Sequence, residues 1–371
     1  MINKTDVVII GGGIAGVGIA YYLALSGVTS TVVERDSIGS HASGFAYGGL
    51  SGGIPNGPNI NTPLIDYSMS LFPSLVEHLT SETAIDLQFR RRELLRIALT
   101  QNDIAELQKH AAWQNQQTNY KVSWLDESEA KKMEPRINQQ TIGALHVDGS
   151  YDIEPYRLTL ALAQASEKLG AKIISGEVTS IHQDGNRVTG VEVDHKFIKC
   201  DKIVIAMGPW SMQAEKWLNV NIPVKPLKGQ IIRLKHDGKP FEFSIGHGKN
   251  YAMTKPSDGL VWCGTTEEDA AFDESPTAVG RDKIIDSSLE MLPCLENSEL
   301  VLQTACLRPV TPDNGVILGE VPGVQGAFIA TGGGRQGIMM GPAISKLLTD
   351  IILSNQPECP IDQFSLLRFN E

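Results

Sequence analysis

Three glycines near the start of the chain have the spacing of a nucleotide-binding turn. Gly11, Gly13 and Gly16 form the pattern G-x-G-x-x-G, directly after the apolar run 6–10 and before a segment with helical spacing. The first glycine permits a tight bend, the second lets a pyrophosphate approach the helix N-terminus, and the third lets helix and strand pack closely. We therefore expect the turn to bind a cofactor through Gly11, Gly12, Gly13, Ile14, Ala15 and Gly16.

An acidic residue follows at the distance that ribose recognition requires. Glu34 ends the strand expected over 31–34. A carboxylate at this place binds ribose hydroxyls, which disfavours the 2′-phosphate of NADP. The pattern alone does not separate NAD from FAD, and a glycine-rich capping turn without a ligand is the structural alternative.

A second glycine-rich junction lies far along the chain. Residues 330–337 read Ala-Thr-Gly-Gly-Gly-Arg-Gln-Gly, between an apolar run and an apolar-faced helix expected over 338–353. The helix N-terminus there would direct its positive dipole end at the N1/C2 edge of a reduced flavin, where negative charge develops. Two such junctions favour FAD, because its adenine and flavin ends lie far apart.

The elements around these turns predict two kinds of sheet. The run 6–34 reads as strand, helix and strand, which is the usual start of a doubly wound sheet. Further expected elements of this type are a helix over 155–169, a strand over 172–175, a hairpin over 178–193, and strands over 202–206 and 327–330. Residues 220–310 alternate apolar and polar side chains in short runs, which indicates an antiparallel sheet.

The segment 64–150 carries no motif of its own. Amphipathic helical spacing is present over 71–79, 103–113 and 127–133, so we interpret this segment as an insertion. Before it, residues 39–63 are rich in Gly, Ser, Asn and Pro, and a loop of that length in a compact domain usually has a function.

Charge and cysteine content exclude several classes of protein. The chain of 371 residues has 32 Lys plus Arg against 43 Asp plus Glu, a net charge of −11 that disfavours nucleic acid as a partner. We therefore interpret Arg90-Arg91-Arg92 as the polar face of a strand or loop. The five cysteines form no C-x-x-C pair, which suggests neither disulfides nor a zinc site. Neither a leader peptide nor a membrane-spanning run is evident, so we expect a cytoplasmic protein without an integral membrane segment.

Glycine is concentrated where a dinucleotide would approach the backbone. Of the 36 glycines, fourteen lie in the three loops 11–18, 44–53 and 332–337, and the remaining chain has an ordinary glycine content. In all three loops the backbone would have to approach a dinucleotide closely, and none of the three is a place where the core needs glycine.

Motifs along nearly the whole chain resemble those of the glycine oxidase and D-amino acid oxidase family of flavoproteins. The resemblance rests on 11–34, the loop 43–50 (S-G-F-A-Y-G-G-L), Glu154-Pro155-Tyr156, the turn 206–211, and 307–313 (L-R-P-V-T-P-D) with the glycine-rich end. It implies a mixed α/β fold, in which a Rossmann-like FAD-binding domain is interleaved with an antiparallel-sheet substrate domain. We expect 1–80, 145–220 and 305–371 to form the FAD-binding domain, and 81–144 and 221–304 the substrate-binding domain.

The resemblance also implies which residues hold FAD. The turn 11–16, Glu34 and Arg35 match the ADP-binding part, and the residue matching the backbone contact to adenine is Val178. The remaining cofactor positions lie along the flavin: Ser43, Ala46, Gly48, Gly49, Leu50, Ala206, Gly208, Trp210, Gly333, Gly334, Arg335, Gln336, Gly337, Ile338 and Met339.

Arg308 and Tyr251 match the family's substrate-binding and catalytic positions. The arginine forks onto the substrate carboxylate, for which a planar guanidinium is well suited, and the tyrosine hydrogen-bonds the same group. A surface ion pair for Arg308 and core packing for Tyr251 are the structural alternatives. Arg335 is assigned to the substrate as well as to the cofactor.

Cys306 is a candidate for a covalent bond to the flavin. It occupies the position at which the related monomeric sarcosine oxidases carry a flavin-linked cysteine, whereas a buried cysteine that only packs is the alternative. Met339 stands where those enzymes place a substrate-binding lysine, which argues against a sarcosine-type site. His41 lies in the flavin loop, where a lone histidine is usually solvated.

The family resemblance implies an FAD-dependent enzyme that oxidises the C–N bond of a small amino acid or N-substituted glycine. Hydride would pass from Cα to flavin N5, and the imine would hydrolyse to a keto acid and an amine. The electron acceptor, oxygen or a quinone or carrier protein, stays open, and a homo-oligomer is compatible with the sequence. The alternatives are a 2-hydroxy-acid dehydrogenase and a non-catalytic nucleotide-binding module.

Overall fold

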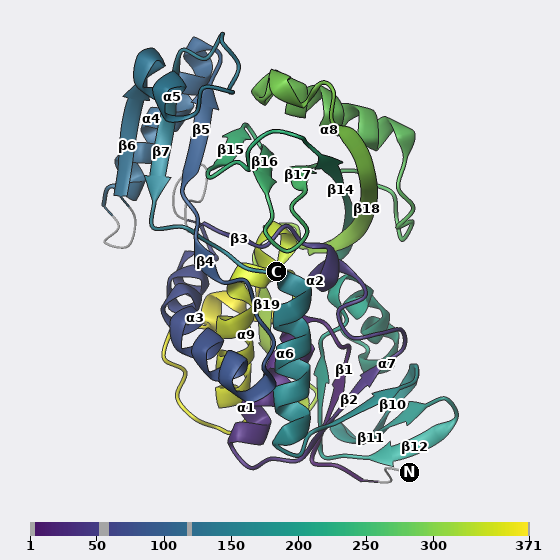
Figure 1. The fold of residues 1–371 in the computed structure, drawn as a ribbon. Coiled ribbons are helices and arrows are strands. Elements are labelled where there is room, and N and C mark those ends of the chain that lie inside the picture. Colours follow the sequence, from purple (N-terminus) through teal and green to yellow (C-terminus); the bar gives the residue numbers. More distant parts are fainter. Residues whose placement is uncertain (1–3, 52–58, 117–120, 370–371) are drawn as a thin grey trace.

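The computed structural model describes residues 4–51, 59–116 and 121–369. Figure 1 shows a region of helices around a parallel sheet that carries the N-terminus, and a second region dominated by a curved, mainly antiparallel sheet. Segments from both ends and from the middle of the chain build the first region, so the two regions are interleaved as the sequence predicts.

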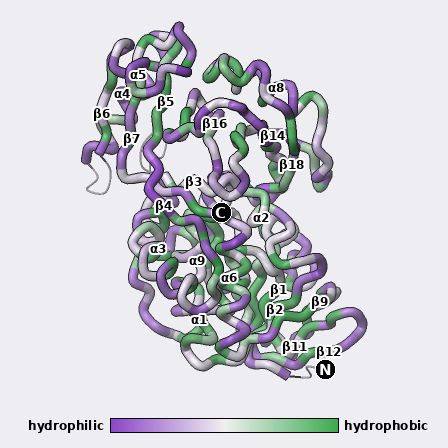
Figure 2. The backbone as a smooth tube through the Cα atoms, viewed as in Figure 1, coloured by the Kyte–Doolittle hydropathy of each residue, from purple (hydrophilic) through white to green (hydrophobic). Residues whose placement is uncertain are grey.

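The first region is built on a six-stranded sheet. Its strands, in spatial order, are β19 (Ile317–Glu320), β20 (Ala327–Thr331), β13 (Lys202–Ile205), β1 (Val7–Ile10), β2 (Ser30–Glu34) and β9 (Lys172–Ser175). All neighbouring pairs are parallel except β19 with β20. The apolar run of β1 is explained by this position: Val7 and Ile9 pack into one core and Val8 and Ile10 into the other, because side chains alternate across a strand. In Figure 2 the strands β1 and β2 are mostly green, whereas outer loops are mostly purple.

Helices cover one face of this sheet and a small antiparallel sheet covers the other. The helices are α1 (Ile14–Leu25), α3 (Thr62–Thr83), α6 (Pro155–Lys168) and α9 (Gly337–Ile352), and they share one core. The second core lies under β10 (Val178–Asp184), β11 (Arg187–Val193) and β12 (Lys196–Lys199). No helix in the described ranges is long and apolar enough to cross a membrane.

The second region is an eight-stranded sheet. Its strands, in spatial order, are β18 (Glu299–Val310), β14 (Lys225–Lys235), β17 (Val261–Gly264), β16 (Asn250–Thr254), β15 (Ser244–His247), β5 (Leu94–Ala98), β7 (Gly143–Asp148) and β6 (Lys121–Asp126). Only β15 with β5 is parallel. α8 (Ala278–Met291) and α5 (Glu127–Met133) pack with one face, and α4 (Gln101–Gln114) covers β5 to β7 on the other.

The segment 64–150 contributes to both regions. The three expected helices are present as parts of α3, α4 and α5, and the strands β5, β6 and β7, which were not predicted, extend the antiparallel sheet. These strands are short, and their pairing with residues beyond 240 cannot be inferred from local spacing. The helix α8 was not predicted either.

A three-stranded sheet of short strands joins the two regions. It contains β3 (Gly49–Leu50), β8 (Tyr151–Asp152) and β4 (Arg90–Arg91). Asp152 is buried and accepts a 2.6 Å hydrogen bond from the buried Lys255 ammonium and one of 3.2 Å from Arg90. Arg92 is also buried and donates to the carbonyls of Phe241, Glu242 and Thr254. The interpretation of the three arginines as a polar face therefore holds for Arg91, which is exposed, but is wrong for Arg92.

The remaining short helices lie in loops. They are α2 (Ala42–Phe45), α7 (Glu215–Leu218) and the 3₁₀ helices Gly208–Ala214, Pro293–Leu295, Gly334–Gln336, Asp362–Phe364 and Leu366–Phe369. Of the glycine-rich loop 44–53, Gly52 and Gly53 lie outside the described residues.

Candidate active site

A cavity of about 900 Å³ lies between the carboxyl edge of the six-stranded sheet and one face of the eight-stranded sheet. The first wall comes from segments that follow parallel strands: the glycine turn after β1, Glu34 at the end of β2, and the segments after β9, β13 and β20. Ligands of open α/β sheets bind at this edge. The volume is at the upper end of the usual range for ligand sites, as an extended cofactor plus a substrate would require.

The structure brings nearly all the predicted site residues to this cavity. The lining includes Gly11, Gly12, Gly13, Ile14, Ala15, Glu34, Arg35, Ser43, Ala46, Gly48, Gly49, Val178, Ala206, Gly208, Trp210, Tyr251, Cys306, Arg308 and every residue from Gly333 to Met339. Gly16 and Leu50 do not line it. Leu50 is fully buried in the helical core, and Gly16 is buried in the first turn of α1.

The glycine turn has the close contacts that its pattern predicts. Gly11 has φ of +109°, and a Cβ atom there would lie 2.4 Å from the carbonyl oxygen of Ala206. A Cβ atom on Gly16 would lie 2.0 Å from the carbonyl oxygen of Gly11, so this glycine lets α1 pack against the turn. The Ser43 hydroxyl accepts a 3.0 Å hydrogen bond from the amide of Ile14, which ties the loop 39–48 to the start of α1.

Glu34 lies beside the same turn. One carboxylate oxygen accepts a 2.6 Å hydrogen bond from the amide of Gly12, and the other accepts one of 2.8 Å from the amide of Asp36. These two amides fix the carboxylate at the cavity wall. Its contact with a ribose stays a prediction.

Arg308 lies at the opposite end, on β18. Its guanidinium donates to the carbonyl oxygen of Thr266 at 3.0 Å and to the hydroxyl of Thr265 at 2.7 Å. Within the described ranges it forms no ion pair, and burial lowers the pKa of its side chain. A Cβ atom on Gly229 of β14 would lie 1.9 Å from an Arg308 nitrogen, so the arginine needs a glycine beneath it. These contacts exclude the surface ion pair as an explanation for Arg308.

Tyr251 faces the cavity from β16 and stacks on a second tyrosine. The ring centroids of Tyr251 and Tyr47 are 3.8 Å apart, and the Tyr47 hydroxyl lies 2.5 Å from the Ser244 hydroxyl. Burial raises the pKa of both phenols, so both stay protonated donors at neutral pH. Sequence reasoning missed Tyr47 as a side-chain contact, although it stands between predicted residues of the flavin loop.

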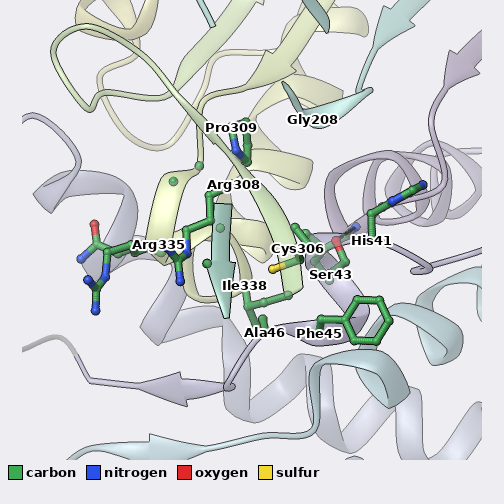
Figure 3. A pocket seen from close by; sticks show the side chains of 18 of the residues that line it. His41, Ser43, Phe45, Ala46, Gly208, Cys306, Arg308, Pro309, Arg335 and Ile338 are labelled. Atoms are coloured by element: carbon green, nitrogen blue, oxygen red, sulfur yellow. Dashed lines mark hydrogen bonds between the residues drawn. The ribbon is translucent and has the colours of Figure 1, made fainter. Parts of the chain in front are cut away.

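Arg335 is held by an acidic partner. It donates to Glu267 at 2.9 Å and to the carbonyl oxygen of Lys249 at 3.0 Å, and the Lys249 ammonium contacts the same carboxylate. In Figure 3 Arg335 lies to the left of Arg308, and Cys306, Ser43 and His41 lie to the right. Arg335 is near enough to Arg308 to lower the pKa of that guanidinium, after burial.

Cys306 is a buried thiol in the cavity wall. Burial raises its pKa to about 11, and the nearby Arg308 opposes that shift. The thiol is therefore protonated at neutral pH, and a protonated thiol is a weak nucleophile.

His41 is not a solvated loop residue. One ring nitrogen lies 2.9 Å from the carboxylate of Glu274, and the other lies 3.0 Å from that of Asp36. The ring also packs beside Trp210, with centroids 4.6 Å apart. Because Glu274 precedes α8 in the region of the eight-stranded sheet, His41 joins the two regions at the rim of the cavity.

Comparisons with known proteins agree with this geometry. The model of a family described as "FAD dependent oxidoreductase" matches residues 6–351. The chain belongs to this family of FAD-dependent oxidoreductases. Two similar proteins come from Pseudomonas aeruginosa: a glycine oxidase, 30% identical over 95% of each chain, and hydrogen cyanide synthase subunit HcnC, 28% identical over 99% of this chain and 97% of that one. The crystal structure of glycine oxidase from Geobacillus kaustophilus superposes with a TM-score of 0.93, 27% identity and 98% coverage of both chains.

FAD is therefore the cofactor, and the cavity fits it. The cradle at Gly11, which a single Cβ atom would fill, leaves the backbone open to a pyrophosphate, and α9 begins at the cavity on the flavin side. Family membership makes the protein a flavoenzyme, which sets aside the non-catalytic nucleotide-binding module.

Proposed function

We propose that this flavoenzyme oxidises the C–N bond of a small amino acid or N-substituted glycine to an imine, which water then hydrolyses to a keto acid and an amine. The observation that carries the proposal is Arg308, a partly buried guanidinium that faces the cavity without an ion-pair partner in the described ranges. A partly buried cation without an ion-pair partner favours an anionic ligand, and the planar guanidinium can form two parallel hydrogen bonds to a carboxylate. The glycine oxidases among the relatives support the same substrate class.

The protein's own part in the reaction is to bind, orient and desolvate. FAD supplies the hydride acceptor when bound. Arg308 would hold the substrate carboxylate and Tyr251 would donate to it from its protonated hydroxyl, which fixes the direction of the Cα–H bond. The cavity-facing side of the eight-stranded sheet would exclude water from the imine until it is released.

The roles proposed for the remaining residues follow from their positions. Gly11 to Ala15, Glu34 and Arg35 would hold the ADP part, with Val178 against adenine. The loop 43–49, the segment 206–210 and the start of α9 would surround the flavin, and Gly16 would act only through helix packing.

Replacing Arg308 with Ala tests the proposal. We expect KM for carboxylate substrates to rise on the order of 10² to 10³-fold, because truncating one partner of a desolvated charge pair costs about 2–5 kcal/mol. The FAD content should stay that of the wild type, which the ratio of flavin to protein absorbance measures. Arg281→Ala, on exposed α8 beside Asp282, is the matched control. An unchanged KM in Arg308→Ala would contradict the assignment.

A 2-hydroxy acid is the second candidate substrate, because the same guanidinium would hold its carboxylate. Anaerobic bleaching of the flavin by matched amino and hydroxy acids separates the two, and we expect bleaching by the amino acids. The electron acceptor is a separate question, which a comparison of peroxide formation in oxygen with reduction of a quinone dye answers.

A further inference from the structure

Three glycines and three long side chains form a trough across the eight-stranded sheet. The register pairs Arg96 of β5 with Gly246 of β15, Gly246 with Tyr251 of β16, and Tyr251 with Gly264 of β17. Side chains of residues paired in this way share one face of a sheet. Gly229 of β14 and Arg308 of the neighbouring strand β18 extend this row, and we define the trough as Arg96, Gly246, Tyr251, Gly264, Gly229 and Arg308.

Each glycine of the trough lies beneath a side chain from the next strand. A Cβ atom on Gly264 would lie 2.5 Å from the Tyr251 hydroxyl, and one on Gly246 would lie 3.8 Å from Cγ of Arg96. With Arg308 over Gly229, the trough has an arginine at each end and a tyrosine between them. All six residues except Gly264 line the cavity.

The positive charges in and beside the trough outnumber those that a single substrate carboxylate would neutralise. Arg96 donates to the carbonyl oxygen of Gly248 at 2.7 Å and has no ion-pair partner in the described part of the chain. Arg335 lies near Arg96, because it donates to the carbonyl oxygen of Lys249 at 3.0 Å, next along the chain to the Gly248 carbonyl that accepts from Arg96. Its charge also lowers the pKa of Arg96 and that of Arg308, in each case in addition to burial. The cations are therefore Arg96, Arg308, Arg335 and Lys249, against the single carboxylate of Glu267.

One further acid lines this end of the cavity. Glu106 of α4 is exposed and forms no ion pair in the described ranges. With it included, two positive charges are still unmatched. A substrate with one carboxylate would neutralise one of them at Arg308 and leave Arg96 partly buried without a counter-charge, which is unfavourable.

We propose that the preferred substrate carries a second carboxylate, which Arg96 binds beside Arg335 while Arg308 binds the first. The substrate class is thus an acidic amino acid or a glycine whose nitrogen carries a carboxyalkyl group. This inference rests on the proposed function, because Arg308 must hold the carboxylate next to the oxidised carbon. In this arrangement Arg96 determines specificity and takes no part in hydride transfer.

The test compares each dicarboxylate with its neutral amide, which has nearly the same shape. The pairs are aspartate with asparagine, glutamate with glutamine (both enantiomers), and N-carboxymethylglycine with N-carbamoylmethylglycine. The measurement is anaerobic reduction of the bound FAD by stopped flow, with limiting rate and apparent Kd for each compound. In at least one pair we expect the ratio of limiting rate to apparent Kd for the dicarboxylate to exceed that for the amide by tenfold or more.

Variants of Arg96 separate specificity from structure. Arg96→Gln should lower the dicarboxylate-to-amide ratio at least tenfold, and Arg96→Lys should restore part of it, whereas Arg281→Gln should leave the ratio as in the wild type. If Arg96 only stabilises the turn at Gly248, Arg96→Gln should lower the rates of flavin reduction by the dicarboxylate and by its amide equally. The dicarboxylate-to-amide ratio would then not change, which would overturn the inference.

The outcomes also distinguish this inference from the proposed function. Reduction by monocarboxylic amino acids with no preference for a second carboxylate overturns the inference and keeps the function. Reduction by 2-hydroxy acids alone overturns both.

Discussion

The two ends of the cavity are built by different means. At the nucleotide end the wall is backbone: the turn after β1 and the loop that Ser43 ties to it lie within the first 50 residues. At the substrate end the wall is side chains, with Arg96, Tyr251 and Arg308 laid over glycines of neighbouring strands. On the proposed function, the first end would recognise a constant cofactor by shape, and the second would select a ligand by charge. Substitutions at the two ends should therefore separate into losses of FAD and losses of substrate affinity.

Gly11→Ala should give the largest effect at the nucleotide end. The new methyl group would meet the carbonyl oxygen of Ala206, in a backbone conformation with φ of +109° that alanine rarely adopts. We expect roughly a tenfold or greater loss of FAD affinity together with a lower Tm, because backbone strain of this kind costs about 1–3 kcal/mol before the steric clash is counted. The flavin content of the purified protein and titration of the apoprotein with FAD measure it.

The variant Gly170→Ala separates the effect of backbone strain from the effect of damaging the turn that binds FAD. Gly170 ends α6 with φ of +103°, but a Cβ atom there meets no atom within 4 Å. This variant should lose stability and keep full FAD content. If it loses as much FAD as Gly11→Ala, the turn after β1 has no special role.

Gly229→Ala should change the substrate end alone. Its methyl group would displace the Arg308 guanidinium, so we expect KM for carboxylate substrates to rise on the order of 10 to 100-fold, less than for Arg308→Ala because the charge is retained. FAD content should not change. Gly246→Ala is the comparison, because its Cβ atom would meet nothing nearer than 3.5 Å, and its effect on KM should be smaller. Equal effects would show that the glycines do not position Arg308.

The same difference between the two ends explains which parts of the site can be predicted from the sequence. The turn after β1, the strand that ends at Glu34 and the junction before α9 are local patterns, and the structure has each of them where expected. The trough depends on register between strands that are far apart in the chain: Arg96 pairs with Gly246, and Gly229 pairs with Cys306. No local spacing specifies such a register.

The distribution of glycines shows the same limit of prediction from local patterns. Three loops hold the glycine excess, as expected, yet Gly229, Gly246 and Gly264 belong to the ordinary background and still determine the shape of the substrate end. The concentration of glycine in the three loops therefore does not reveal these three positions. Arg92 and His41 were misjudged for a related reason, because their partners Glu242 and Glu274 come from distant segments.

A further question is whether Cys306, at the substrate end, forms a covalent bond to the flavin. The thiol has its pKa raised to about 11, which leaves little thiolate for attack on the flavin. We expect acid precipitation to leave a colourless pellet and to release all the FAD into the supernatant. A yellow, fluorescent pellet that becomes colourless in Cys306→Ser would reverse this expectation and link the two ends through the cofactor.

The contact of His41 with Glu274 and Asp36 joins the two regions at the rim of the cavity, and its effect should be the smallest and depend on pH. The carboxylate of Glu274 is the main cause that raises the pKa of His41 above its usual 6.5, and Asp36 adds to it. A raised folded-state pKa stabilises the fold fully below the unfolded value, and this contribution is lost as pH rises through the folded value. Partly exposed ion pairs contribute about 1 kcal/mol or less, so we expect His41→Gln to lower Tm by about 1–2 °C at about pH 5.5 and to have almost no effect at about pH 9.

The variant Glu274→Gln should reproduce this pH dependence, and the double variant should add little to either single change. His195→Gln is the control, because the His195 side chain is 93% exposed and lies 3.7 Å from its nearest acid. If His41→Gln lowers Tm equally at both pH values, packing of the ring on Trp210 holds the rim together and the ion pairs do not. The two regions would then be held together at the rim by packing and not by ion pairs.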